Sequence, residues 1–287
     1  MTSTSAKPDN NFTSVGKRPV RHDGYDKVIG KAQYAADINL PGLLQGKVLR
    51  SPHAHAEILS IDVSRAEAHP EVQAVITNNN FPSYEHDQKQ QTDNIMASDK
   101  VLYKGHAVAA VAASSAHAAE EALSMIRVEY KILDPITNVE DALKDGAPLL
   151  HKEYENNITS HSQLKLGDID TGFKNADHVV EREFRTSTVH QGYIEPHSAT
   201  GWWTANDKVT IWGSSQGHFQ IRDKTADVLG IPHSAIKAIP LEIGGGFGGK
   251  TTIYLEPVAA MLSKVSGSPV KVTMSRADVL EATGPTS

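Results

Sequence analysis

A glycine-rich stretch most constrains what this chain can fold into. Five glycines surround one phenylalanine in GGGFGGK, residues 244–250. Such a run is typical of a loop whose backbone presses closely against a ligand, because glycine lets the backbone approach it. The apolar run IKAIPLEI precedes the loop and TTIYLEPVAAMLSKVSG, with a helical pattern, follows it. The sequence therefore predicts a strand, a glycine loop and a helix in that order.

The same stretch also satisfies the phosphate-loop pattern G-x-x-x-x-G-K-[ST], through Gly244, Gly249, Lys250 and Thr251. A P-loop nucleotide-binding protein is therefore one alternative. Only about 20 residues follow the predicted helix, too few for the further parallel strands of such a domain. A diphosphate also gains nothing from a central phenylalanine. A purely structural turn is a second alternative, and a loop of amides that faces an anionic cofactor is favoured.

Composition excludes several other kinds of protein. The net charge of −6 disfavours nucleic-acid binding, which usually requires a basic surface. The chain has no cysteine, which excludes thiolate nucleophiles and cysteine-ligated iron–sulfur clusters, so any electron transfer would need clusters on a partner chain. No segment resembles a signal peptide or approaches a membrane span of ~20 residues, and we expect a cytoplasmic protein.

The pattern along the chain predicts an α+β (mixed α/β) protein with several parts. Residues 1–16 are polar and predict a disordered tail. Short apolar runs separated by turn residues then predict a small mixed sheet with a helix, up to about residue 135. Pro135 and the turn at 146–148 indicate a linker before the second half of the chain.

Three segments carry more specific expectations. Residues 78–94, NNNFPSYEHDQKQQTDN, have no periodicity and predict an exposed loop. Residues 178–189, HVVEREFRTSTV, alternate apolar and polar side chains and predict a strand. Residues 217–230, GHFQIRDKTADVLG, are amphipathic and stop at glycine, which predicts a helix.

Two motifs in order carry a family resemblance. WGSSQGHFQIRDKTADVLGIP lies some thirty residues upstream of GGGFGGK. Together they resemble the molybdenum-binding (large) subunit of the xanthine dehydrogenase/aldehyde oxidase family of molybdenum hydroxylases, in its N-terminal portion only. Residues 30–66, YKGHAVAAVAA and IRVEYKILDPI are similar to that family's α/β hammerhead domain.

The resemblance implies a particular domain organisation. A hammerhead-type α/β domain would occupy residues 17–135 and a linker residues 136–160. The first part of a molybdopterin-binding α+β domain would occupy residues 161–287.

The resemblance also implies a molybdenum–molybdopterin cofactor with no direct protein ligand to the metal. Gln216 matches the glutamine whose side-chain amide donates a hydrogen bond to a molybdenum oxo ligand, which stabilises negative charge there. Gly245, Gly246, Phe247 and Gly248 match the loop whose backbone approaches the metal and its pterin. These five residues are the expected cofactor-binding set.

Other positions receive weaker assignments. Thr251 stands where purine-oxidising members have a glutamate, which disfavours xanthine, and Thr251 and His106 are candidates for the substrate pocket. A buried structural role is an equal alternative for His106. We expect Lys250 to cap or buttress the loop, with a solvated lysine as the alternative. His190 and Glu195 are expected to be structural.

The function implied is part of the catalytic subunit of a multi-subunit molybdenum hydroxylase. Such an enzyme oxidises or hydroxylates a carbon centre of a small molecule with water-derived oxygen. No glutamate here matches the family's general base, so no catalytic residue is assigned. A second molybdopterin-binding chain would complete the site, iron–sulfur clusters and FAD would lie on partner subunits, and the cytosine dinucleotide is one candidate form of the cofactor. A truncated or non-catalytic fragment of the same family is the alternative.

Overall fold

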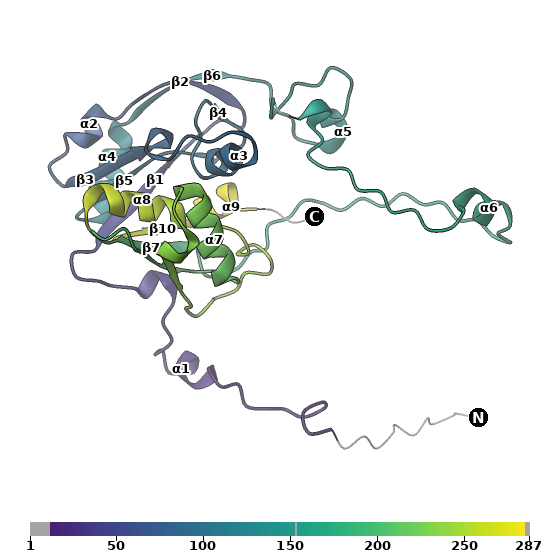
Figure 1. Ribbon diagram of the computed structural model, residues 1–287, viewed down its shortest axis with the longest axis horizontal. Coiled ribbons are helices and arrows are strands. Elements are labelled where there is room, and N and C mark those ends of the chain that lie inside the picture. Colours follow the sequence, from purple (N-terminus) through teal and green to yellow (C-terminus); the bar gives the residue numbers. More distant parts are fainter. Residues whose placement is uncertain (1–11, 153, 285–287) are drawn as a thin grey trace. The chain divides into compact units, whose positions relative to one another are not determined.

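The computed structural model describes residues 12–152 and 154–284 (Figure 1). The chain divides into two compact units, residues 1–33 and 34–287. Within its described residues, the first unit contains one short helix, α1 (Gly24–Val28), which buries no side chain. Most of the predicted tail, residues 1–11, lies outside the described residues.

The second unit contains a large mixed sheet and a small one. The larger sheet has the strand order β3 (Val72–Thr77), β5 (Ala107–Ala113), β1 (Leu44–Arg50), β10 (Val270–Thr273), β7 (Ser198–Trp203), β8 (Val209–Gly213), β9 (Ile236–Ile239). The smaller sheet has the order β4 (Lys100–Val101), β2 (Ala56–Asp62), β6 (Arg127–Ile132). In the larger sheet β1 pairs with β10, and β8 with β9, in parallel, whereas the other pairs are antiparallel.

Helices connect these strands. The α-helices of this unit are α2 (Ser64–Glu67), α3 (His86–Ile95), α4 (Ala116–Met125), α5 (Val139–Ala142), α6 (Ile169–Lys174), α7 (His218–Leu229), α8 (Glu256–Ser266) and α9 (Arg276–Ala282). Short 3₁₀ turns are η1 (Ala35–Asp37), η2 (Asn78–Asn80), η3 (Glu155–Asn157) and η4 (His233–Ala235). Among the described residues, no helix has both the length and the apolar character needed to cross a membrane.

Strand β5 shows why the core lies on both sides of the large sheet. Its seven residues are all buried. Ala110 and Ala112 belong to the main core, which includes α8. Ala109 and Val111 pack with Ala122 of α4 instead. Because successive side chains of a strand point to opposite faces, α8 and α4 cover opposite faces of this strand.

The parallel pair β1 and β10 joins segments that are more than 200 residues apart in the chain. Gln45 lies opposite Lys271 in this pair, so the sheet contains strands from both predicted domains. The division at residues 135 and 161 stays a prediction. The mixed α/β class is confirmed, as are the helix at α7, ending at left-handed Gly230, and the helix at α8.

Two sequence predictions about local structure were wrong. The predicted loop at 78–94 contains η2 and most of α3, whose end buries Ile95 in the main core. Tertiary burial and the i,i+4 pair between Lys89 and Asp93 support a helix that has little periodicity of its own. The predicted strand at 178–189 forms no strand; only an isolated bridge occurs, at Val189.

Candidate cofactor site

The glycine loop forms an irregular turn between β9 and α8. Gly245 and Gly248 have φ of 98° and 92°, and Phe247 between them has φ of 50°. A bulky residue rarely adopts this left-handed conformation, so the tip of the loop is strained. The Phe247 side chain is 73% exposed, which means that it does not stabilise this conformation by burial within the chain.

Two of the glycines are required by close contacts. A Cβ atom at Gly246 would lie 2.5 Å from Oε1 of Gln216, and one at Gly249 would lie 2.7 Å from Cε1 of Tyr193. Both distances are shorter than carbon can tolerate, so any other residue would displace the neighbouring side chain. The glycines therefore let the loop pack directly against residues of two other segments.

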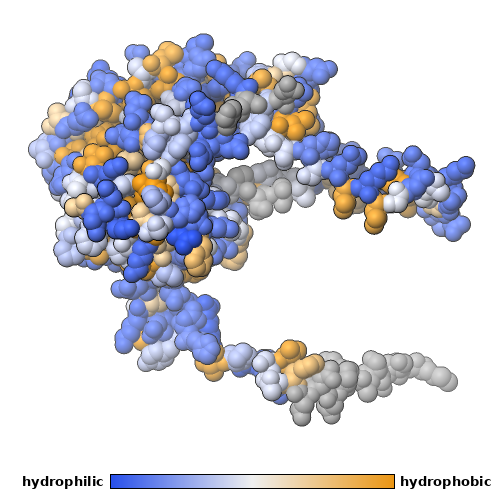
Figure 2. All heavy atoms as spheres, viewed as in Figure 1, coloured by the Kyte–Doolittle hydropathy of each residue, from blue (hydrophilic) through white to orange (hydrophobic). Residues whose placement is uncertain are grey.

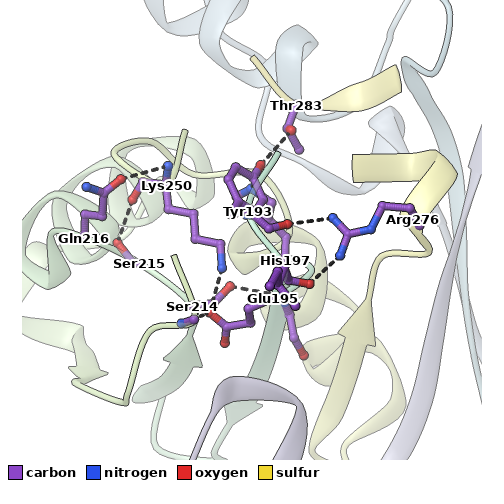
Figure 3. Close-up of polar contacts among 12 residues, drawn as sticks. Tyr193, Glu195, His197, Ser214, Ser215, Gln216, Lys250, Arg276 and Thr283 are labelled. Carbon is purple, nitrogen blue, oxygen red and sulfur yellow. Dashed lines mark hydrogen bonds and ion pairs between the residues drawn. The ribbon is translucent and has the colours of Figure 1, made fainter. Parts of the chain in front are cut away.

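Gln216, just before α7, is fixed in orientation by the loop (Figure 3). Its backbone N–H donates to the carbonyl of Lys250 at 2.9 Å. Its side-chain Oε1 accepts hydrogen bonds from the backbone N–H groups of Gly248 at 3.0 Å and Lys250 at 3.3 Å. Since both are donors, they fix which end of the amide faces the loop. The exposed side chain keeps Nε2 as a donor with no hydrogen bond among the described residues.

Lys250 is buried beneath the loop and does not face a ligand. Its side chain is fully buried, and Nζ lies 2.6 Å from Oε2 of Glu195. The same Oε2 accepts a hydrogen bond from the N–H of Gly244 at 2.7 Å, so Glu195 ties together the two ends of the loop. Burial lowers the pKa of Lys250, whereas Glu195 acts to raise it. The expectation that Lys250 buttresses the loop is confirmed, and the solvated alternative was wrong.

A second layer of polar side chains lies behind this ion pair. Tyr193 is buried, its ring lies 4.9 Å from Nζ of Lys250, and its hydroxyl is 2.8 Å from Nε2 of His197 and 2.9 Å from Oγ1 of Thr283. Arg276 donates to the carbonyl of Tyr193 at 2.8 Å. Burial lowers the pKa of His197 to about 3, so the ring is neutral at pH 7. Through Arg276 and Thr283, this layer connects Tyr193, which packs on Lys250, to helix α9.

The tip of the loop keeps unused hydrogen-bond donors. The amides of Gly245, Gly246 and Phe247 donate no hydrogen bond within the described chain, whereas those of Gly244 and Gly248 are bonded to side chains as described above. Three consecutive free amides in a glycine-rich turn form a set of donors suited to an anionic or polar ligand. They lie at the expected cofactor-binding positions.

The structure does not bring His106 to this loop. His106 is fully buried, with its ring stacked on Tyr103. Its Nδ1 accepts from the N–H of Leu102 at 3.2 Å, and Nε2 lies 2.6 Å from the carbonyl of Asp93. Burial lowers its pKa to about 4. These contacts support the structural alternative for His106.

Thr251 lies at the exposed end of the loop and donates from Oγ1 to the carbonyl of Gly248 at 2.9 Å. A cavity of about 880 Å³ lies close by in the chain, lined by α3, α9 and residues 252–254. Neither Thr251 nor the other predicted site residues are among the described residues that line it. His190 does line it.

The phosphate-loop alternative fails on two points of geometry. Helix α8 begins at Glu256, six residues after Lys250, so the loop does not lie at a helix N-terminus. Lys250, which would have to reach a phosphate, is buried against Glu195. The residues have the spacing of a phosphate loop, but the helix N-terminus and the accessible lysine that bind phosphate in such a loop are not found here.

Glu195 is the residue whose importance the sequence did not reveal. It lies 55 residues before Lys250, and no local spacing relates the two. Its other oxygen, Oε1, and Oε1 of Gln191 are buried acceptors without a hydrogen-bond partner in the described chain. The sequence signal was limited to an acidic residue in the segment HQGYIEPHSAT.

Both halves of the chain match known families. Residues 150–287 match the family described as molybdopterin cofactor-binding domain. Residues 29–134 match the a/b hammerhead domain of aldehyde oxidase and xanthine dehydrogenase.

Individual relatives agree with these matches. The chain is 36% identical over 258 residues to a probable xanthine dehydrogenase subunit of Bacillus subtilis, and the match covers 90% of this chain and 34% of that protein. It is 34% identical over 266 residues to the nicotinate dehydrogenase large molybdopterin subunit of Eubacterium barkeri, covering 92% and 62%.

The fold agrees as well. The crystal structure of quinoline 2-oxidoreductase from Pseudomonas putida 86 superposes with a TM-score of 0.80 and 28% identity, covering 92% of this chain and 35% of that one. The chain thus spans about a third of the length of the Bacillus and Pseudomonas proteins. With both domain families present in order, the chain belongs to the xanthine dehydrogenase/aldehyde oxidase family of molybdenum hydroxylases and corresponds to the N-terminal portion of their molybdenum-binding subunit.

Proposed function

We propose that this chain forms one wall of the molybdenum site in a multi-subunit molybdenum hydroxylase. The observation that carries the proposal is the pairing of Gln216 with the glycine loop. Two loop amides hold Oε1 of Gln216, which leaves Nε2 as a donor beside three free amides at residues 245–247. This arrangement presents only donors, as a ligand rich in oxygen and negative charge requires.

The residues present fit such a cofactor. The loop is closely packed on one side, since a Cβ at Gly246 would collide with Gln216, and exposed on the other, where Phe247 projects. The buried acceptors Oε1 of Gln191 and Oε1 of Glu195 have no partner in the described chain. Buried acceptors of this kind are normally satisfied, and the N–H groups of a pterin or of an additional polypeptide would be suitable donors.

When bound, a molybdenum pterin supplies two-electron chemistry coupled to the use of water-derived oxygen. The chain's own contribution is electrostatic. Nε2 of Gln216 would donate a hydrogen bond to the bound cofactor, and such a donor would stabilise negative charge on it. The amides of residues 245–247 orient the bound group. Lys250 and Glu195 act from beneath, by keeping these donors in place.

The partners and substrate follow from the family. The names of the Bacillus and Eubacterium relatives describe them as subunits. By analogy, a second molybdopterin-binding chain would complete the site and supply the general base, and partner subunits would carry iron–sulfur clusters and FAD. Thr251 would face the substrate, a small molecule oxidised at carbon. The cytosine dinucleotide is one candidate form of the cofactor.

Metal and cofactor analysis of the natively purified complex tests this function. We expect the chain to co-purify with a larger partner, molybdenum and a pterin, and to be inactive alone. A stable monomer that never retains molybdenum or a partner in its native extract would overturn the proposal. As a control for the phosphate-loop alternative, ATP should give no thermal stabilisation, in the wild type or in Lys250→Ala.

A further inference from the structure

The tip of the glycine loop, residues 245–247, has a strained backbone that its own side chain does not stabilise. Phe247 has φ of 50° and is 73% exposed. Backbone strain of this kind persists only where the surrounding structure over-determines it. The ion pair of Lys250 with Glu195 acts on the ends of the loop, so the tip needs a support of its own.

One side chain meets the loop on both sides of this tip. A Cβ atom at Gly245 would lie 3.1 Å from Cβ of Tyr193, and a Cβ atom at Gly249 would lie 2.7 Å from Cε1 of the same residue. The amides of residues 245–247 lie in the chain between these two contacts. Tyr193 therefore limits how the backbone can cross the tip, and both contacted positions are glycines.

Tyr193 is itself fixed at its hydroxyl and at its backbone (Figure 3). Its hydroxyl lies 2.9 Å from Oγ1 of Thr283 and 2.8 Å from Nε2 of His197, and its carbonyl accepts from Arg276 at 2.8 Å. Figure 2 shows apolar residues scattered among hydrophilic ones at the surface, where side chains have freedom to move. Tyr193 is only 1% exposed, so its ring has a defined place from which it can hold a strained backbone.

The segment around Tyr193 contacts the loop through every second residue. A Cβ atom at Gly249 would lie 3.0 Å from Oε1 of Gln191, and one at Gly244 would lie 2.6 Å from Cβ of Glu195. The backbone N–H of Glu195 also donates to the carbonyl of Gly244 at 3.2 Å. Several glycines of the loop therefore occupy the positions where this segment touches it, with the ring of Tyr193 at the centre.

Resting on the proposed function, we propose that Tyr193 is the positioning residue for the cofactor-binding donors of the loop. It acts through the backbone: its ring holds the amides of residues 245–247 in one orientation, and its hydroxyl holds the ring. A segment made mostly of glycine has little rigidity of its own. The ring supplies the preorganisation that electrostatic stabilisation of a bound group requires.

The amide signals of the loop test this without the cofactor. They are measured by nuclear magnetic resonance on the full chain labelled with ¹⁵N-glycine. We expect the signals of Gly245 and Gly246 to move in Tyr193→Leu and to stay near their wild-type positions in Tyr193→Phe, which keeps the ring. Tyr130→Leu, in strand β6 of the small sheet, is the control and should leave both signals in place. Unmoved signals in Tyr193→Leu would overturn the proposal.

The complete complex separates a positioning role from support of the fold alone. At equal molybdenum content, Tyr193→Leu should lower kcat at least about tenfold and change KM less than about threefold, because donors to the transition-state charge are misplaced. The paramagnetic resonance spectrum of the half-reduced metal should change as well, and Tyr193→Phe should restore both. A wild-type spectrum and kcat in Tyr193→Leu would contradict the positioning role. A wild-type complex without molybdenum would count against the proposed function instead, while the amide signals still decide the role of Tyr193.

Two glycines of the loop supply a matched pair of variants. Gly249→Ala directs its Cβ at the ring of Tyr193, whereas Gly246→Ala directs its Cβ at Gln216. Combined with Tyr193→Leu, Gly249→Ala should lower kcat at least about threefold less than it does in the wild type, because the ring is gone, whereas Gly246→Ala should lower it equally in both. Equal effects of Gly249→Ala in both backgrounds would overturn the proposal.

Circular dichroism checks that Tyr193→Leu folds. If it does not, Gly249→Ala with the ring in place gives the decisive result. Its Cβ presses on the ring at 2.7 Å, so the amide signal of Gly245, on the other side of the tip, should move. An unmoved signal would show that the ring does not link the two sides of the tip and would contradict the role of Tyr193.

Discussion

The glycine loop and residues 178–189, called here the orphan segment, are both irregular in structure, but only the loop is held by contacts with other segments. The loop is supported from beneath by a buried ion pair between Lys250 and Glu195 and from the side by Gln216. Over residues 178–188 the orphan segment makes no backbone hydrogen bond to any described residue, and its Phe184 is exposed. Two irregular segments of one chain therefore differ in whether contacts with other segments fix their backbone.

The difference lies in which polar groups are satisfied. In the loop, the flanking amides are bonded, whereas the amides of residues 245–247 donate no hydrogen bond to the described part of the chain, which indicates a ligand with acceptor groups. In the orphan segment the backbone of residues 178–188 forms no hydrogen bond within the described chain, and only Val189 forms an isolated bridge. A buried frame around a few free groups indicates a ligand site, whereas backbone unpaired in the described chain, with exposed apolar side chains, is typical of a surface that further polypeptide covers.

Removing the carboxylate beneath the loop should have the largest effect on stability. Glu195→Ala leaves Nζ of Lys250 buried without its partner and also the N–H of Gly244 unbonded. We expect the free energy of unfolding to fall by about 3 kcal/mol or more, measured by urea denaturation. The control is Glu57→Ala, which breaks the exposed pair with Lys131 and should cost less than about 1 kcal/mol. Equal losses would show that the loop has no buried support.

Two buried histidines, His106 and His197, predict a dependence of stability on pH. Burial lowers the pKa of His106 from 6.5 to about 4 and that of His197 to about 3. The unfolded chain then binds protons that the folded chain excludes, so this stability is complete above pH 6.5 and is lost as the pH falls toward 4. For His106 the loss approaches about 3 kcal/mol.

Nuclear magnetic resonance of the imidazole rings checks these two groups separately from the carboxylates. Both rings should remain neutral at pH 5 in the folded chain. A midpoint near pH 6.5 would contradict the burial of that ring, and for His197 it would also contradict the packed layer behind the loop.

A methyl group inside the loop should have an intermediate effect. In Gly246→Ala the new Cβ meets Oε1 of Gln216 at 2.5 Å, so the amide must move and its hydrogen bonds weaken. We expect a loss of about 1 to 3 kcal/mol in the free energy of unfolding. Gly172→Ala in α6, where nothing lies within 4 Å, is the control. A neutral result for Gly246→Ala would mean that the loop is loosely held.

The orphan segment should give the smallest effect in the isolated chain. Phe184→Asp should change the unfolding free energy by less than about 0.5 kcal/mol, because the ring is already exposed. Thermal unfolding of the isolated chain measures this, beside the same variant in the assembled complex. A large loss in the isolated chain would show that the segment is packed after all, and the contrast with the loop would disappear.

The parts of this picture that were predictable are those that depend on local pattern. The helices α7 and α8 and the glycine loop follow from local sequence patterns, whereas the link between the loop and Gln216 came from the family resemblance of two motifs. The ion pair of Lys250 with Glu195 was not predictable, because only the fold brings these residues together. The same holds for His106, whose burial depends on contacts with Asp93 and Leu102.

The two local errors have the opposite cause. Helix α3 forms although its sequence has little periodicity, because its end is buried in the core. The orphan segment has strand periodicity but forms no strand, because pairing is a property of two segments and its partner is absent from the described chain. A sequence pattern indicates which secondary structure a segment can adopt, and tertiary contacts determine whether that structure forms.

The rate of metal reduction by substrate in the complete complex tests the central claim most directly. It should be measured in single turnovers on the wild type and on Gln216→Ala, with molybdenum content determined on the same samples. We predict similar molybdenum content and a rate about 10- to 100-fold lower in the variant, because a donor to the developing charge is lost. An unchanged rate at full molybdenum content would contradict the role assigned to Gln216 and to the loop that orients it.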